Sequence, residues 1–186
     1  MSSASEFIES LMAQGRYHFT TAEAVVALGG PLAKVRAELR QLKADGKVVD
    51  PHRSFHVIVP ADRRACGCLP PLALVPPLMQ YLHESYYVAL LSACELYGVR
   101  PPQEHPFQVM AKVTRKPIEC GEVHLQFLGR KDLEQTPLRA ESSPRPALRV
   151  ASPEATALEL VGYANQCGGL VNIAAVLDEL VSSLDP

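Results

Sequence analysis

The chain has 186 residues, 47% of them hydrophobic and 20% charged, with a formal net charge of −2 at pH 7. This composition is enough for a packed core and excludes a disordered chain. No apolar run reaches the length of a membrane span, and the N-terminal residues lack the basic start and apolar stretch of a signal peptide, so we expect a cytoplasmic protein with no membrane partner.

The first part of the chain predicts two short helices. Ser3–Glu6 and Thr20–Glu23 each have the spacing of a capping box, in which the first and fourth residues satisfy each other's backbone N–H groups. Apolar residues at helical spacing follow both boxes, and Gly15 and Gly29 end the two helices.

A third, basic helix is predicted from Pro31 to Asp45, with Gly46 as its terminator. Its core stripe consists of Leu32, Val35, Leu39 and Leu42. The opposite face places small alanines between Lys34, Arg40 and Gln41, which would let the helix lie close to a DNA groove. Taken alone, this face is more typical of an ordinary solvated helix, and only the elements before and after it favour DNA binding.

Two strands, at 47–49 and 55–59, follow this helix and are joined by the turn residues 50–54. Helix, turn, helix and hairpin in this order predict a winged helix-turn-helix, which usually presents its second helix to the major groove. The charge supports this only weakly, since residues 1–60 hold seven basic and six acidic side chains, and the remainder 11 and 14. The predicted DNA-binding residues are Lys34, Arg36, Arg40, Gln41, Lys43 and Arg53.

The prolines between residues 60 and 77 predict a break in regular structure and a domain boundary. Beyond it we expect buried helices at 78–82 and 86–98, strands at 107–113, 123–128 and 148–150, a loop at 136–147, and helices that begin at Ser152 and after Gly169. The predicted fold class is α+β, with a winged helix-turn-helix at 1–64 and a small mixed α/β domain at 70–186.

Five scattered cysteines favour reduced thiols over a disulfide framework. Cys66 and Cys68 are too close together for a zinc knuckle, and no second pair follows. Cys120 and His124 would share one face of a strand, but Gly121 between them is typical of a turn, which removes the geometry of a nucleophile pair. We therefore expect no metal, no cofactor and no catalytic residue.

Several segments of the second part resemble the AbiEi family, the antitoxins of bacterial type IV toxin–antitoxin systems. They are Tyr86–Ala93, Tyr97-Gly98-Val99, Ser152-Pro153-Glu154-Ala155-Thr156-Ala157-Leu158 and Gly168-Gly169-Leu170. The resemblance implies an N-terminal domain that binds double-stranded DNA and represses the protein's own operon, and a C-terminal domain that counteracts a nucleotidyltransferase-like toxin. The Ser-Pro-Glu segment also makes a good helix N-terminus by itself. Many family members continue beyond the position equivalent to Pro186, so we expect either a short member or one with incomplete antitoxin function.

Three interpretations of function are open at this stage. The first is the antitoxin and repressor, which a neighbouring nucleotidyltransferase gene would favour. The second is a transcriptional regulator whose C-terminal domain senses a ligand or mediates oligomerisation, without a toxin partner. The third, a small enzyme with a winged-helix accessory, would require activity that depends on Cys120 or His124.

Overall fold

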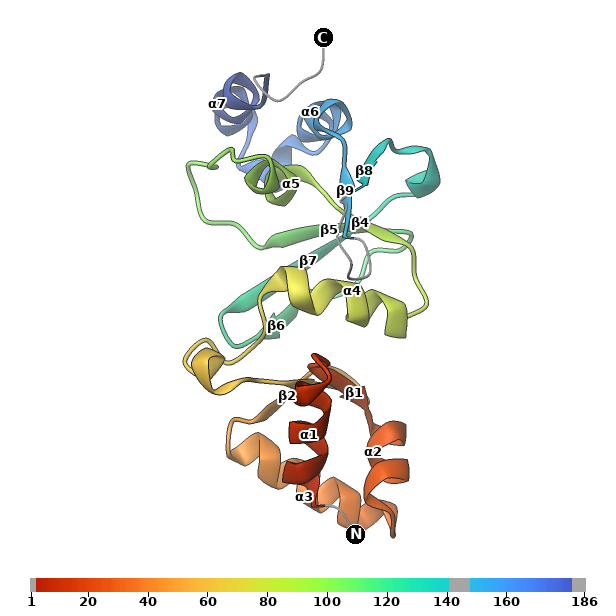
Figure 1. Cartoon of the computed structure of the whole chain (residues 1–186). Coiled ribbons are helices and arrows are strands. Elements are labelled where there is room, and N and C mark those ends of the chain that lie inside the picture. The colour runs from red at the N-terminus through yellow and green to blue at the C-terminus, as the bar shows by residue number, and fades with distance from the viewer. Residues whose placement is uncertain (1–2, 141–147, 182–186) are drawn as a thin grey trace. The chain divides into compact units, whose positions relative to one another are not determined.

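The computed structural model describes residues 3–140 and 148–181 and has an α+β fold, as the sequence predicts. Its contacts divide the chain into two compact units. The first comprises Met1–Tyr81 and Ile118–His124, and the second comprises Leu82–Pro117 and Leu125–Pro186. Figure 1 shows the elements in chain order, coloured from red to blue. No helix within the described residues is long and apolar enough to cross a bilayer.

The first unit contains helices and a three-stranded sheet of order β1-β3-β2, with both pairings antiparallel. Its first six elements are α1 (Ala4–Ala13), β1 (His18–Thr20), α2 (Thr21–Leu28), α3 (Leu32–Ala44), β2 (Val48–His52) and β3 (Phe55–Ile58). Both predicted capping boxes are present, at Ser3–Glu6 and Thr20–Glu23. The three helices and the sheet enclose one core, whose members include Ile8, Phe19, Leu28, Val35, Leu39, Leu42, Val48 and Ile58.

Strand β1 was not predicted, because a strand of three residues is too short to show an alternating pattern. The hairpin also differs from its prediction. Strand β2 continues through Pro51 to His52, which pairs with Phe55, so only Arg53 and Ser54 form the turn. Ser54 has a φ of 59°, and a bulge between Val49 and His52 accommodates the proline.

The predicted break at 60–77 is wrong over its second half. A 3₁₀ turn at Ala61–Arg63 is followed by α4 (Pro71–Tyr81), which contains Pro76 and Pro77. The helix persists because four apolar side chains of its inner face are buried, and this burial outweighs the backbone hydrogen bonds that the two prolines cannot make. These side chains are Leu74, Val75, Leu78 and Met79.

The division of the chain therefore differs from the expected boundary at residues 64–70. Helix α4 packs against β3, and β6 (Ile118–Cys120) packs against β2, so both belong to the first unit. A boundary read from proline content could not include β6, which returns to the first unit from a distant part of the chain.

The second unit is built on a mixed sheet of order β6-β7-β5-β4-β9-β8, of which β6 and the start of β7 are grouped with the first unit. Its strands are β4 (Tyr86–Val88), β5 (Phe107–Ala111), β7 (Val123–Gly129), β8 (Leu138–Ala140) and β9 (Arg149–Ala151). Strand β5 runs antiparallel to β4 and parallel to β7, while β9 runs parallel to β4 and antiparallel to β8.

Three helices lie together on one face of this sheet (Figure 1): α5 (Leu90–Leu96), α6 (Pro153–Gly162) and α7 (Leu170–Leu180). Short 3₁₀ turns at Leu133–Gln135 and Ala164–Cys167 complete the unit. The helices and the sheet share one core, with Tyr87 and Met110 from the strands and Leu91, Leu160, Ile173 and Leu180 from the helices.

The predicted strands at 107–113, 123–128 and 148–150 correspond to β5, β7 and β9. The helix predicted at 86–98 is wrong at its start, because Tyr86–Val88 form a central strand, and Leu90 has a φ of 54° where the chain enters α5. Strands β6 and β8 were not predicted, and β8 occupies part of the loop expected at 136–147. Residues 141–147 of that loop lie outside the described residues. Ser152 caps α6 as predicted and accepts a hydrogen bond from the N–H of Ala155.

Candidate nucleic-acid interface

The connection between α2 and α3 is short and glycine-rich. Gly29 and Gly30 have φ values of 66° and 83°, in the left-handed region that glycine adopts without strain. Pro31 is the N-cap of α3, so the helix begins at Leu32, one residue later than predicted. Leu32, predicted as part of the core stripe, is the first residue of α3 and is 43% exposed.

Four of the predicted contact residues point out of the first unit along α3. Lys34, Arg36, Arg40 and Gln41 are exposed, whereas Val35, Leu39 and Leu42 are buried. Within the described residues, the guanidinium groups of Arg36 and Arg40 have no hydrogen bond or ion pair, so both are available to an external anion. Helical periodicity places these two arginines on one side of α3, and Lys34 and Gln41 on the other.

Lys34 and Gln41 are each engaged along the helix. The Lys34 ammonium lies 3.9 Å from Glu38, and the Gln41 amide donates a hydrogen bond of 2.9 Å to Asp45. Both contacts join residues four apart on the helix, to a half-buried Glu38 and an exposed Asp45, and such pairs contribute only a few tenths of a kcal/mol. They can therefore be exchanged for contacts to another molecule at little cost.

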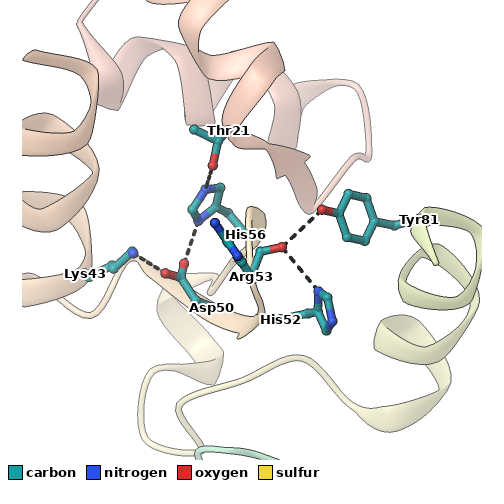
Figure 2. A network of polar contacts seen from close by, with 7 residues as sticks. All are labelled: Thr21, Lys43, Asp50, His52, Arg53, His56 and Tyr81. Carbon is teal, nitrogen blue, oxygen red and sulfur yellow. Dashed lines mark hydrogen bonds and ion pairs between the residues drawn. The ribbon is translucent and has the colours of Figure 1, made fainter. Parts of the chain in front are cut away.

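Lys43 differs from the other predicted contacts, because it forms an ion pair and hydrogen bond with Asp50 of β2. Asp50 also accepts a hydrogen bond at 2.5 Å from Nδ1 of His56 on β3, and the His56 Nε2 lies 2.8 Å from the hydroxyl of Thr21 on α2. We call Thr21, His56, Asp50 and Lys43 the polar chain (Figure 2). It connects α2, α3 and both strands of the hairpin, and His56 is only 4% exposed.

The electrostatics of the polar chain favour an ionised Asp50. Partial burial of the carboxylate would raise its pKa, but the hydrogen bonds from His56 and Lys43 outweigh burial, so the pKa of Asp50 lies below its ordinary value. Sequence reasoning identified Lys43 but missed Asp50 and His56, because no local pattern indicates that residues six apart on a hairpin will meet.

The tip of the hairpin is held by a contact from α4 (Figure 2). The hydroxyl of Tyr81 donates a hydrogen bond of 3.1 Å to the Arg53 carbonyl. The centroid of the Tyr81 ring lies 5.1 Å from that of Phe55 and 5.9 Å from that of His52. The Arg53 side chain is exposed. Helix α4 thus supports the turn that presents this arginine, a role that the sequence did not suggest.

A separate polar cluster is buried in the second unit. Glu159 of α6 accepts hydrogen bonds at 2.6 Å from the Tyr87 hydroxyl and at 2.5 Å from Arg130, and Thr136 lies 3.2 Å from the same hydroxyl. Burial raises the pKa of Glu159 despite these two donors. The cluster borders a hollow of about 460 Å³, which is also lined by Pro137, Leu158 and Tyr163.

The residues of the enzyme interpretation are not brought together. Cys120 ends β6 with its sulfur buried against Cys68, whereas His124 is exposed on β7. Among the described residues, no group of three or more histidine, cysteine or acidic side chains could hold a metal ion.

Comparison with protein families matches residues 87–186 to the AbiEi antitoxin C-terminal domain. Among solved structures, the chain is similar to the crystal structure of the RV2827C protein from Mycobacterium tuberculosis, with a TM-score of 0.62 and 16% sequence identity, over 98% of this chain and 68% of that chain. At this identity the likeness concerns the fold. A search of curated proteins gave no match. Because the matched domain covers more than half of its residues, the chain belongs to the AbiEi antitoxin family.

Proposed function

We propose that this protein is a DNA-binding antitoxin that represses its own operon through a winged helix in the first unit and counteracts a nucleotidyltransferase-like toxin through the second. The match of residues 87–186 to the AbiEi antitoxin domain carries the antitoxin half.

The DNA-binding half rests on the outward face of α3. Two arginines without partners in the described structure stand on the second helix of a helix–turn–helix order, and the hairpin β2–β3 follows directly. A guanidinium can donate two hydrogen bonds to a guanine edge in the major groove, and it is always charged. We assign Arg36, Arg40, Lys34 and Gln41 to contact with DNA, and Arg53 to a phosphate or the minor groove. Lys43 is assigned a positioning role, because its ammonium is paired with Asp50.

The test is fluorescence anisotropy of the full chain with the DNA upstream of its own gene, compared with scrambled DNA across a salt series. We expect tight binding that prefers the upstream DNA and weakens as salt rises, because phosphate contacts release counterions. Arg40→Ala should weaken operator binding by roughly 1–3 kcal/mol if Arg40 reads a base edge.

Lys131→Ala is the matched control, since Lys131 is an exposed cation of the second unit. Its affinity for the upstream DNA should equal that of the unchanged protein. Equal, weak binding to both DNAs would contradict the repressor half. Unchanged affinity of a folded Arg40→Ala protein would overturn the assignment of Arg40 alone.

The antitoxin half is tested by co-expression with a nucleotidyltransferase-like toxin. We expect this chain to restore growth of cells that produce the toxin, and Arg40→Ala to restore it equally when both genes are driven by an unrelated promoter. Continued growth arrest with soluble, folded antitoxin would contradict this half and leave the DNA-binding result unaffected.

A second candidate is a regulator whose second unit senses a small ligand, without a toxin partner. The hollow of about 460 Å³ beside Arg130, Glu159 and Tyr163 favours it, because it is large enough for a small molecule and combines charged with apolar walls. A metabolite that changes operator affinity, together with failure to neutralise the toxin, would support this candidate over the first.

A further inference from the structure

Two cysteines of the first unit meet although they are 52 residues apart in the sequence. The sulfur atoms of Cys68 and Cys120 lie 2.6 Å from each other, and both thiols are free. The two residues are 1% and 5% exposed. A disulfide bond measures about 2.05 Å, so only a small movement of the side chains separates this thiol pair from a covalent bond.

The backbone holds the two segments at this distance. The N–H of Glu122 donates a hydrogen bond of 2.9 Å to the carbonyl of Cys66. Each of these residues lies two positions from one cysteine of the pair, with Gly121 or Gly67 in between. A Cβ atom added to Gly121 would lie 2.1 Å from that carbonyl oxygen and 2.8 Å from the Cα of Gly67. The absence of side chains at both glycines therefore permits the approach that brings the sulfurs together.

The two thiols are chemically unequal. The hydrogen bond that they share lowers the pKa of Cys68, because its thiolate accepts the S–H of Cys120, and the same contact raises the pKa of Cys120. The thiolate is the nucleophile in oxidation as in exchange, so Cys68 is the thiol that reacts first and Cys120 is suited to resolve the product.

The remaining cysteines are poorer nucleophiles. The neighbouring Glu122 raises the pKa of Cys66. Burial raises the pKa of Cys94 to about 12 and that of Cys167 to about 11. A low concentration of a small oxidant should therefore select the pair in the first unit.

We propose that Cys68 and Cys120 are a site of reversible oxidation, at which a small peroxide converts two thiols into a disulfide. The Cys68 thiolate attacks one oxygen of hydrogen peroxide, the O–O bond breaks, and the leaving hydroxide takes a proton to become water, which leaves a sulfenic acid on Cys68. The sulfur of Cys120 then attacks the Cys68 sulfur, the S–S bond forms, the S–O bond breaks, and a second water leaves with the thiol proton. Two thiols and one peroxide thus give one disulfide and two waters.

This bond would tie the segment after the 3₁₀ turn to β6, which packs on β2 of the hairpin sheet. It would close a loop over the intervening chain and so restrict the unfolded state. The inference does not depend on the proposed function, because it concerns the chemistry of the thiols and makes no assumption about DNA or toxin.

The test uses the full chain, reduced and then treated with a slight excess of hydrogen peroxide. Free thiols are alkylated, and the protein is digested without reductant for mass spectrometry. We expect one cross-linked peptide pair containing Cys68 and Cys120, lighter by two hydrogen atoms than the reduced pair, with the other cysteines alkylated. Dithiothreitol should reverse the link, and the oxidised protein should melt roughly 5–15 °C above the reduced one.

Cys66→Ser is the matched control, since it removes the adjacent thiol and leaves the pair intact, and it should retain the link. Cys120→Ser should instead accumulate a sulfenic acid on Cys68 that dimedone traps. If that variant fails to fold, the peptide map of the unchanged protein still decides the question. Alkylation of all five cysteines after peroxide treatment would overturn the proposal, as would a link that joins Cys66 to Cys68 or Cys94 to Cys167.

Discussion

Asp50 is an acidic residue that joins two basic side chains of the first unit. It accepts hydrogen bonds from His56 on β3 and from Lys43 on α3, and so fixes the hairpin to the helix that presents the exposed arginines. Buried hydrogen-bonding groups cost free energy when their partners are removed. The loss of this one carboxylate would leave an imidazole buried with an unmatched ring nitrogen.

We expect Asp50→Asn to lower the free energy of unfolding at neutral pH by roughly 1–3 kcal/mol, because Asn lacks the charge that the two donors stabilise. The folded-state pKa of Asp50 lies below its unfolded value, so its contribution is present above the unfolded pKa and is lost as pH falls through the folded pKa. Urea titrations through the acid range should therefore show a shallower fall in stability for the variant than for the unchanged protein.

Asp45→Asn serves as the comparison, because Asp45 is exposed at the end of α3 and its carboxylate accepts a hydrogen bond from the exposed Gln41 amide. Its neutral-pH effect should be well below that of Asp50→Asn. Equal effects of the two substitutions would mean that the polar chain does not stabilise the fold.

At the scale of elements, α4 is the least expected part of the first unit. It contains two consecutive prolines, yet it buries four apolar side chains and places Tyr81 against the hairpin turn. Proline at position 76 cannot donate the backbone hydrogen bond that an interior helical residue gives to the carbonyl four residues earlier. The burial of these apolar side chains therefore offsets the free-energy cost of two prolines inside the helix.

Pro76→Ala should raise the free energy of unfolding by roughly 1–2 kcal/mol, since the gain in helix propensity of about 3 kcal/mol is partly offset by greater freedom of the unfolded chain. Pro71→Ala is the matched control, because the first residue of a helix has no partner for its N–H and gains nothing from alanine. Chemical denaturation of both variants makes the comparison. A gain from Pro71→Ala as large as that from Pro76→Ala would contradict this account.

Whether an element could be predicted depends on how close in the sequence the residues that stabilise it lie. Capping boxes, glycine terminators and the apolar stripe of α3 depend on residues within a few positions, and they predicted α1, α2, α3 and the start of α6. Tyr86–Val88 and α4 depend on tertiary partners instead: the former pairs with β5 and β9, and the latter gains its stability from burial. Local propensity therefore misassigned Tyr86–Val88 and the first part of α4, whereas the helix predicted at 78–82 corresponds to the end of α4.

The residues of the candidate interface also differ in whether their environment could be predicted from the sequence. The exposed positions of Lys34, Arg36, Arg40 and Gln41 follow from helical periodicity, which the sequence contains. The ion pair of Lys43 with Asp50 and the support of Arg53 by Tyr81 join residues whose meeting depends on the tertiary fold. Sequence alone could nominate basic side chains, but not separate those that are free from those that are engaged.

At the scale of the whole molecule, the chain leaves the first unit after Tyr81, returns to it at Ile118–His124, and then completes the second. The units are thus interleaved in sequence. A fragment that ended at residue 81 would lack β6, which packs against β2, and would lose one of the two thiols of the cysteine pair. Point substitutions in the full chain are therefore better suited than truncation to separate the roles of the two units.

We expect Glu154→Ala, on α6 of the second unit, to leave operator affinity unchanged, because the proposed DNA contacts lie in the first unit. Fluorescence anisotropy under the conditions used for Arg40→Ala provides the measurement, and thermal unfolding verifies that the variant is folded. Loss of operator binding by a folded Glu154→Ala protein would refute the separation of roles between the units.

The polar chain also defines what can be exchanged between related proteins. His56 on the hairpin reaches Thr21 on one helix and, through Asp50, Lys43 on another. A chimera that imported only a foreign β2–β3 hairpin would place a new strand pair against helices that evolved with a different one. The smallest transplantable piece is therefore the hairpin together with positions 21 and 43. A redesign of the proposed DNA contacts should vary positions 36 and 40 of α3 and keep Thr21, Lys43, Asp50 and His56 together.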